Sequence, residues 1–448
     1  EVSNNVSSLE LGRQNINQLM LSQTIIEERL KTAHRLVTYL EDSAKRTNLV
    51  KELSSEFYDH NFYKNLDCNP NIYHCLNGVF DLDTCVFREG APSDMVTISS
   101  HNVYIKDELR FSDPEYQKYD EELNDFLDKI LPDYELKEYM MNIWAISLSG
   151  KSIKQTCNVC TGTGSNGKTV NFELLEIMFG EYFTTASPAL LTKCRNDANA
   201  PSPAVASLRG KRIVCCSEPD EKEPIKTGVM KEMTGGDRLV GRHLNMPPIE
   251  FKPQHNIFFL CNDKPDIEST DEGTWRRIRV TPYMSKFCDV DDERLKNKKY
   301  KYHFPKDSNI KEKFEQWKEV LLNELIKRYI ELKENNFEIR LPKLVTEAID
   351  EYKSVHNVYE TFKKDCLIKS SGERLLISDA FIVFREHADQ CNQKIRNINR
   401  NTFITEMSRV LGKPKQNKYW KDWSVIEISG DDEDNEQEDS DSENDYEN

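Results

Sequence analysis

The sequence contains the stretch Gly162-Thr163-Gly164-Ser165-Asn166-Gly167-Lys168-Thr169, a complete GxxxxGK[ST] motif. It lies between a strand-like apolar run at residues 157–161 and a helical pattern at residues 170–179, the context that this motif requires. Its glycines let successive backbone N–H groups turn toward phosphate oxygens, and the start of the following helix adds its dipole. The alternative is a chance glycine-rich turn. The motif predicts a nucleotide-binding α/β domain in which Lys168 contacts the β- and γ-phosphates of ATP and Thr169 ligates Mg²⁺.

Two further strand-like runs end in polar residues suited to hydrolysis. The run at residues 212–216 ends at Ser217-Glu218, so one carboxylate of the usual acidic pair is missing. We expect Glu218 to orient the attacking water and to help hold Mg²⁺, and the alternative is a solvated turn acid. The run at residues 256–261 ends at Asn262, whose amide is expected to hold the water or to sense the γ-phosphate.

Arginines follow the third of these strands in Trp275-Arg276-Arg277-Ile278-Arg279. Isolated arginines usually form surface salt bridges. In an ATPase, arginines at this point are candidate arginine fingers, which stabilise transition-state charge across a subunit boundary. We expect Arg277 to be the finger because an apolar run follows it directly, with Arg276 as the second candidate.

Composition excludes several classes of protein. The 448 residues are 38% hydrophobic and 31% charged, which excludes a wholly disordered chain and a small disulfide scaffold. The net charge of −16 includes eleven acids between residues 431 and 447, so any polyanion site must be a local patch. No long apolar run or signal-peptide pattern is present, and a first residue other than Met suggests a piece of a longer protein. The twelve cysteines are expected to be reduced, with zinc at Cys157 and Cys160 or around Cys68 as the less favoured alternative.

Periodicity along the chain predicts its organisation. Helical patterns fill residues 1–66, a small β-meander follows, and two helices precede the phosphate-binding motif. From residue 156 to about residue 283, strands alternate with helices, as in a largely parallel sheet. A loop-like, Lys-rich segment and long helices come next. These segments are residues 72–99 for the meander, 119–130 and 135–148 for the helices, 286–306 for the loop, and 311–334 and 344–369 for the long helices.

The C-terminal part predicts a winged helix. Helices at residues 378–390 and 401–411 and a hairpin at residues 418–428 follow the order of a winged helix. Residues 391–422 contain eight basic residues and only two acids. Arg400 and Lys418 are expected to contact DNA phosphates, and Trp420 to stack on a base. The alternative is a module that docks proteins.

The motifs resemble those of superfamily 3 helicases. Between Glu218 and Asn262 lie Lys231-Glu232-Met233-Thr234-Gly235-Gly236-Asp237, Arg242-His243 and Phe251-Lys252-Pro253, which complete the four ordered motifs of that group. The resemblance implies an AAA+ core, a ring of identical subunits (a hexamer), and a hairpin that contacts DNA in the central channel. It implies DNA contacts by Arg242, His243 and Asn245, and it matches Trp275-Arg276-Arg277 to the finger position.

The closer resemblance is to poxvirus- and asfarvirus-type primase–helicases of large cytoplasmic DNA viruses. It includes Leu76-Asn77-Gly78-Val79-Phe80-Asp81-Leu82 and covers roughly residues 70–290; the Lys-rich segment at residues 286–306 aligns with nothing. The resemblance implies a primase domain N-terminal to this chain, other replication proteins as partners, and a location at viral replication sites in the host cytoplasm. The lack of a long apolar run predicts that no part of this chain spans a membrane.

The expected fold class is α/β, with an AAA+ type P-loop ATPase core between an N-terminal α+β domain and a C-terminal winged-helix-like domain. The expected function is that of a ring-forming, ATP-dependent DNA helicase that translocates on single-stranded DNA. The alternatives are an AAA+ ATPase that remodels protein assemblies and an ATP-locked scaffold without activity. The expected domains are residues 1–115 (N-terminal domain), 116–150 (helical collar), 151–310 (ATPase), 311–345 (connector), 346–429 (winged helix) and 430–448 (disordered acidic tail).

Overall fold

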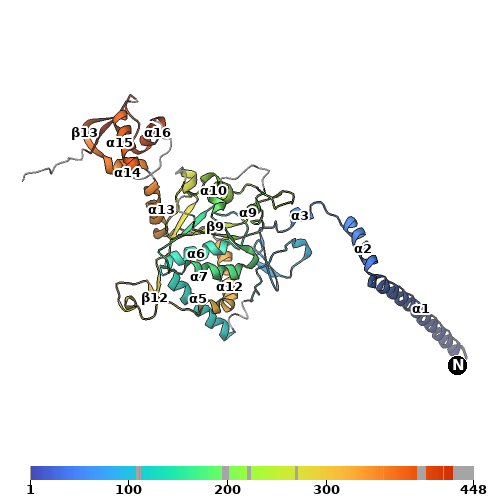
Figure 1. Cartoon of the computed structure of the whole chain (residues 1–448). Helices are drawn as coiled ribbons and strands as arrows, with labels where there is room; N and C mark the ends of the chain where they lie inside the picture. The colour runs from blue at the N-terminus through green and yellow to red at the C-terminus, as the bar shows by residue number, and fades with distance from the viewer. Residues whose placement is uncertain are drawn as a thin grey trace, which may run out of the picture. The chain divides into compact units, whose positions relative to one another are not determined.

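The computed structural model describes residues 2–106, 110, 112–193, 201–218, 223–267, 271–356, 358–390, 400–416 and 418–426. The chain divides into two compact units, residues 1–65 and residues 66–448. The first unit contains helices α1 (Val2–Glu41), α2 (Ser43–Glu56) and α3 (Phe62–Asn65), which confirms the helical pattern expected there (Figure 1). Asp42 begins α2 as its N-cap, since its carboxylate accepts from the backbone N–H groups of Ala44 and Lys45.

The second unit begins with the expected meander. Strands β1 (Ile72–Cys75), β2 (Gly78–Asp81) and β3 (Val86–Arg88) form an antiparallel sheet. Gly78 opens β2 at φ 151°, and a Cβ there would lie 2.5 Å from the Arg88 carbonyl oxygen, so the turn requires glycine.

Three helices form one layer of the second unit: α5 (Pro114–Ile130), α6 (Tyr134–Ile146) and α12 (Phe314–Glu334). Asp113 and Asp133 cap the first two, which explains where those helices begin. Helix α12 packs against α5, α6 and α7 (Lys168–Phe179), with Phe126 and Trp317 in ring contact at 5.2 Å. Segments far apart in the sequence are thereby joined into one core.

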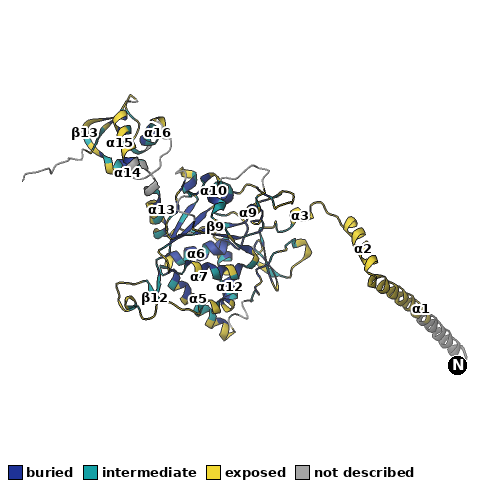
Figure 2. Cartoon of the chain, viewed as in Figure 1, coloured by how far each residue is buried: buried dark blue, intermediate teal, exposed yellow. Residues whose placement is uncertain are grey.

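The central sheet is parallel and has the strand order β10-β4-β9-β6-β5. Its apolar strands are largely buried, as expected for a parallel sheet covered on both faces, and Figure 2 shows them in dark blue. This confirms the α/β class and the parallel sheet. The strands are β4 (Cys157–Thr161), β5 (Phe183–Ala186), β6 (Ile213–Ser217), β9 (Asn256–Leu260) and β10 (Ile278–Pro282).

The segment at residues 286–306 was expected to be a loop, but it contains two short strands. β11 (Lys286–Cys288) and β12 (His303–Pro305) pair in parallel. The remaining short elements of this part of the chain are η1 (Pro92–Asp94), η2 (Gly180–Tyr182), α8 (Ala189–Thr192), α9 (Pro203–Ala206), α10 (Thr227–Thr234), β7 (Leu239–Gly241), β8 (Ile249–Phe251), α11 (Glu272–Trp275), η3 (Glu293–Lys296) and η4 (Ile310–Lys313).

The single long helix expected at residues 344–369 is wrong. The segment instead forms α13 (Lys343–His356), α14 (Val358–Cys366) and the beginning of β13 (Leu367–Leu376). Helix α13 packs against β10, with Tyr352 and Trp275 in ring contact at 5.4 Å. Burying Leu367 in a separate apolar cluster accounts for the change from helix to strand at that point.

The prediction of a wing hairpin at residues 418–428 is also wrong, because the described residues of this segment form a single strand. β14 (Tyr419–Val425) pairs antiparallel with β13, which precedes the helices α15 (Ile377–Gln390) and α16 (Arg400–Leu411). The pairing buries Leu375 beside Trp420. The winged helix is therefore not confirmed. The turn at residues 391–399 and the acidic tail from residue 430 lie outside the described residues.

Candidate nucleotide-binding site

The phosphate-binding loop between β4 and α7 needs its glycines. Gly162 has φ 150°, and a Cβ there would lie 2.3 Å from Asn166 Nδ2 and 2.5 Å from the Tyr283 carbonyl oxygen. Gly167 has φ 81° and opens helix α7. Both positions lie in the region of backbone space that favours glycine, so the loop conformation follows directly from the motif.

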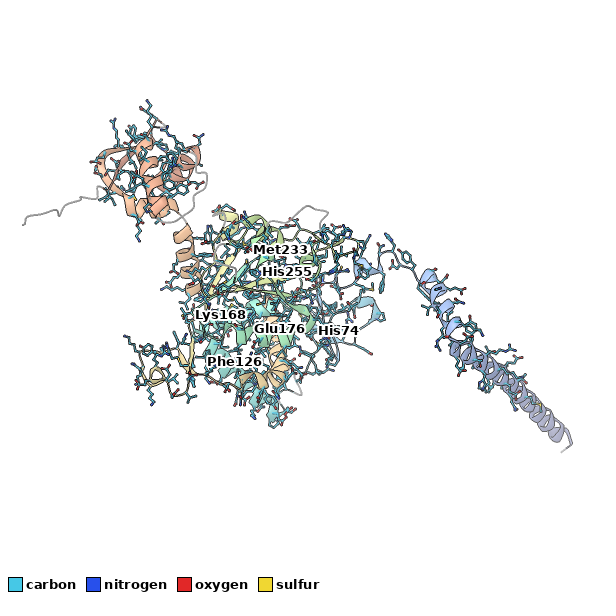
Figure 3. All side chains as sticks on the ribbon, viewed as in Figure 1. His74, Phe126, Lys168, Glu176, Met233 and His255 are labelled. Atoms are coloured by element: carbon cyan, nitrogen blue, oxygen red, sulfur yellow. The ribbon has the colours of Figure 1, made fainter. Side chains whose placement is uncertain are left out.

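Lys168 lies buried at the first turn of α7 within the second unit (Figure 3). Its Nζ donates to the Gly162 carbonyl oxygen at 2.6 Å, so the ammonium is held inside the loop. Burial lowers the pKa of Lys168 below its usual value. A phosphate oxygen in the loop would give this poorly solvated cation a charged partner.

Asn166 supplies a second donor to the same loop. Its Oδ1 accepts from the Lys168 backbone N–H at 3.3 Å, while its buried Nδ2 has no hydrogen-bond partner among the residues that the structure describes. A buried donor without a partner is costly, and a phosphate oxygen would satisfy it. The loop therefore fits a nucleotide phosphate.

Glu218 and Asn262 lie together at the carboxyl ends of the neighbouring strands β6 and β9. The Glu218 carboxylate accepts from the backbone N–H of Asn262 at 3.1 Å, from that of Asp263 at 3.2 Å, and from Asn262 Nδ2 at 3.2 Å. The Asn262 carbonyl oxygen accepts from the Gly162 N–H at 3.4 Å, which links this pair to the phosphate loop. The structure thus brings together the acid, the amide and the loop that the sequence singled out.

Thr169 is exposed at the second position of α7, as a hydroxyl that ligates Mg²⁺ must be. Within the described ranges, no group of three His, Cys, Asp or Glu side chains could hold a metal ion. A Mg²⁺ ion beside Thr169 and Glu218 would therefore take most of its ligands from phosphate oxygens and water, which is common for this ion. The residues present fit that arrangement.

The cysteines at the site are ordinary core residues. Cys157 and Cys160 lie buried in β4, and burial raises the pKa of Cys157 to about 12 and that of Cys160 well above its usual value. Zinc requires thiolates, which this environment disfavours.

Arg276 and Arg277 lie at the opposite end of the sheet from the phosphate loop. The Arg277 carbonyl oxygen accepts from the N–H of Cys157, which begins β4, whereas the loop follows the end of that strand. A five-residue strand spans about 16 Å. Neither arginine is therefore placed beside the phosphate loop of its own subunit.

The two arginines differ in exposure. Arg277 is partly buried, and its guanidinium donates to the Gly273 carbonyl oxygen at 2.8 Å, whereas Arg276 is exposed. Burial is the main cause of the lowered pKa of Arg277. Asp271 caps the preceding turn and binds Lys231 at 2.7 Å, which holds the pKa of Asp271 at about 2.

The expected hairpin is present: β7 and β8 pair antiparallel and enclose residues 242–248. His243 and Asn245 are exposed in this turn, and Asn245 has φ 59°. Arg242 is partly exposed and donates through Nε to the Met246 carbonyl oxygen at 3.1 Å. The turn thus presents one cation and two further polar side chains at its surface.

Sequence reasoning missed two residues that brace the loop. Lys286 Nζ donates to the Gly164 carbonyl oxygen at 2.8 Å, and the Phe287 N–H donates to the Ser165 carbonyl oxygen at 2.7 Å. No local signal marks such contacts, because they join segments far apart in the chain. The high lysine content of residues 286–306 was the available clue.

The C-terminal candidates divide into exposed and buried residues. Arg400 and Lys418 are exposed, as a phosphate contact requires. Trp420 is only 2% exposed, donates to the Gly412 carbonyl oxygen at 2.8 Å, and packs edge-on against Phe403. The expectation that Trp420 stacks on a base is therefore wrong, because its ring forms part of a core.

Two family models match parts of this chain. Residues 10–132 match a family described as D5 N terminal like, and residues 160–277 match a family of unknown function, DUF5906. A solved structure, the A form apo structure of NrS-1 C terminal region, covers 66% of this chain and 67% of its own at 15% identity and TM-score 0.38, too distant to inform the fold. No helix in the described part of the chain is long and apolar enough to cross a membrane.

Curated relatives come from large DNA viruses. The chain is 35% identical over 347 residues to "Putative helicase L207/L206" of Acanthamoeba polyphaga mimivirus, covering 77% of this chain and 35% of that protein. It is 28% identical over 406 residues to "Putative helicase 121R" of Invertebrate iridescent virus 3, covering 86% of this chain and 42% of that protein. It is 23% identical over 294 residues to "Putative primase C962R" of African swine fever virus (isolate Tick/Malawi/Lil 20-1/1983), covering 64% of this chain and 30% of that protein. The chain thus spans less than half the length of these relatives. Its resemblance to the D5-type primase–helicases of large DNA viruses, expected from the sequence, is confirmed.

Proposed function

We propose that this chain is the helicase portion of a viral replication protein, a ring of identical subunits that hydrolyses ATP and draws single-stranded DNA through its channel. The observation that carries the proposal is the contact of Glu218 with Asn262 beside the loop that holds Lys168. The names of the viral relatives support a helicase or primase role in replication. The strand order supports an AAA+ core, since β9 lies between the loop strand β4 and the acid strand β6.

Each residue of the site has a distinct task in this proposal. Lys168 and the N–H groups of the loop bind the phosphates, while Glu218 accepts a proton from the attacking water and Asn262 holds that water in line. Mg²⁺, held by Thr169 and Glu218, would neutralise charge on the phosphates. Arg277 or Arg276 would reach the phosphates of the neighbouring subunit.

The hairpin supplies the contact with DNA. Arg242 would bind a phosphate, and His243 and Asn245 would donate hydrogen bonds to the strand in the channel. Their exposure at the turn between β7 and β8 supports this role.

Two assays on one preparation test the proposal: steady-state ATP turnover with and without single-stranded DNA, and unwinding of a forked duplex. We expect DNA to stimulate turnover and the duplex to be unwound. Lys168→Ala is the control, and it should abolish both activities because it removes the cation that contacts phosphate. Turnover without unwinding would favour a protein-remodelling ATPase, and nucleotide binding without turnover would favour a scaffold.

A further inference from the structure

We propose that residues 289–302, the basic loop between β11 and β12, form a second binding surface for single-stranded DNA, attached to the phosphate-binding loop. This inference rests on the proposed helicase function and adds a contact site to it. In Figure 1 the segment at β12 projects from the body of the second unit. It is the Lys-rich segment that the motifs of the helicase core leave unexplained.

The charge of this segment is divided along its length, with acids in residues 289–293 and cations from Arg294 onward. From residue 294 to residue 306 there are five lysines and one arginine and no acid, in a chain whose net charge is −16. Lys296, Lys298, Lys299 and Lys301 are exposed, and none of them forms an ion pair within the described residues. The four acids of the basic loop all lie in residues 289–293, where Asp292 pairs with Arg294 at 2.6 Å, so the exposed lysines lie in the part of the loop that contains no acid.

Aromatic rings alternate with these cations. Tyr300 is 38% exposed and lies 4.8 Å from the His303 ring, and Lys301 lies over the Tyr302 ring at 5.0 Å. Lysines bind phosphates, and exposed rings stack on bases, so this combination suits single-stranded nucleic acid. An acidic protein segment would use the lysines and leave the exposed ring without a partner, so DNA is the better match.

The base of the basic loop is closed. Lys286 N–H donates to the Tyr302 carbonyl oxygen at 2.9 Å, and Lys306 N–H donates to the Cys288 carbonyl oxygen at 2.8 Å. The rings of Phe287 and Phe304 pack at 6.0 Å across the two strands. These contacts hold the lysines on one short, anchored segment.

The same base contacts the nucleotide site. Phe287 N–H donates to Ser165 and Lys286 Nζ to Gly164, both through carbonyl oxygens of the phosphate-binding loop. A rearrangement of that loop on binding phosphate would therefore act directly on β11. The geometry points to a DNA contact whose strength depends on the bound nucleotide.

The test measures the affinity of the whole chain for a fluorescein-labelled oligothymidylate over a range of salt concentrations. The triple variant Lys298→Ala, Lys299→Ala, Lys301→Ala should bind more weakly and lower the log–log salt slope by about 2, at roughly 0.7 for each lost phosphate contact. The matched control Lys118→Ala, Lys327→Ala, Lys343→Ala makes the same change in net charge on exposed lysines elsewhere and should keep the wild-type slope. Thermal unfolding of both variants checks that they are folded.

Repeating the titration with ADP and with a non-hydrolysable ATP analogue tests the attachment. The wild-type affinity should differ between the two nucleotides, and the triple variant should lose most of that difference. An unchanged slope and affinity in the triple variant, with both reduced by Arg242→Ala and His243→Ala, would overturn the inference and leave the helicase proposal standing. Polyglutamate serves as a second probe, in place of an acidic protein. A triple variant that loses affinity for polyglutamate but keeps its affinity for the oligothymidylate would also overturn the inference, in favour of an acidic protein partner. A wild-type chain that does not bind the oligothymidylate would overturn both proposals.

Discussion

Glu218 accepts three hydrogen bonds, and all three donors belong to Asn262 and Asp263 at the end of β9. With Ser217 beside it in place of a second acid, Glu218 is the carboxylate that the described residues place at this strand end, and in the proposed function it serves as the base for water. Asn262 orients that carboxylate through its side-chain amide. We therefore expect a change in either residue to alter the position of the other.

Glu218→Gln should bind an ATP analogue with near-normal affinity and lose turnover by roughly 10²- to 10⁴-fold, the usual contribution of a general base. Glutamine keeps the shape and can still accept from the Asn262 N–H, but it cannot take a proton. Fluorescent-analogue binding and steady-state hydrolysis measure the two effects. A parallel loss of binding and hydrolysis would show that Glu218 chiefly organises the site.

His255 makes folding stability depend on pH. It is buried between β8 and β9, beside Met233 (Figure 3), and burial lowers its pKa from 6.5 to about 4. The unfolded chain therefore binds a proton more readily, so stability should fall as pH falls from about 6.5 to about 4. At about 1.4 kcal/mol for each unit of pKa, the loss reaches roughly 3 kcal/mol.

Urea unfolding across this pH range measures the effect. His255→Leu should flatten the pH dependence, since it removes the titrating group from an apolar site. His60→Leu, at an exposed position, should leave the dependence as in the wild type. Equal slopes for wild type and His255→Leu would assign the acid sensitivity to other groups.

At the scale of elements, the sequence predicted those whose contacts are local. The phosphate loop, the helices α5 and α6, and the hairpin of β7 and β8 follow from motif, caps and periodicity within short windows. The pairing of β13 with β14 was missed because two helices separate the strands. Trp420 was misassigned for the same reason: among lysines it looks like a stacking residue, and only the distant strand shows that it is buried.

The hairpin is the element on which a helicase and a protein-remodelling ATPase differ. Replacing Arg242 and His243 with Ala should reduce both the stimulation of ATP turnover by single-stranded DNA and the unwinding of a fork, because a phosphate partner and a hydrogen-bonding ring are lost. The salt slope of DNA affinity should fall by about 0.7 for the one lost phosphate contact. Gly241 packs against Ala206 at the base of the hairpin, so the strands should stay paired in this variant. Unwinding at the wild-type rate would rule out a role of the hairpin in tracking DNA.

At the scale of the whole molecule, the sequence predicted a parallel sheet but not its order. The order matters because it makes β6 and β9 neighbours, which brings Glu218 and Asn262 together at the carboxyl ends of the strands. Arg277 directly precedes β10 and lies at the opposite ends of the strands, beside the start of β4. The choice of Arg277 over Arg276 as the finger rested on a following apolar run. The structure adds that Arg276 is the more exposed of the two, a difference set by packing that local sequence does not encode.

This separation leads to a prediction about mixed rings. Arg277→Ala and Glu218→Gln subunits should each be inactive alone and should partly regain ATP turnover when mixed, because some interfaces then join an intact Glu218 to an intact Arg277 of the neighbour. Arg276→Ala mixed with Glu218→Gln, measured in parallel, identifies which arginine crosses the interface. Exchange of subunits is verified by energy transfer between labelled variants. Rings that exchange subunits without regaining turnover would contradict a finger acting in trans. Because neither arginine lies beside the phosphate loop of its own subunit, that result would assign a structural role to Arg276 and Arg277.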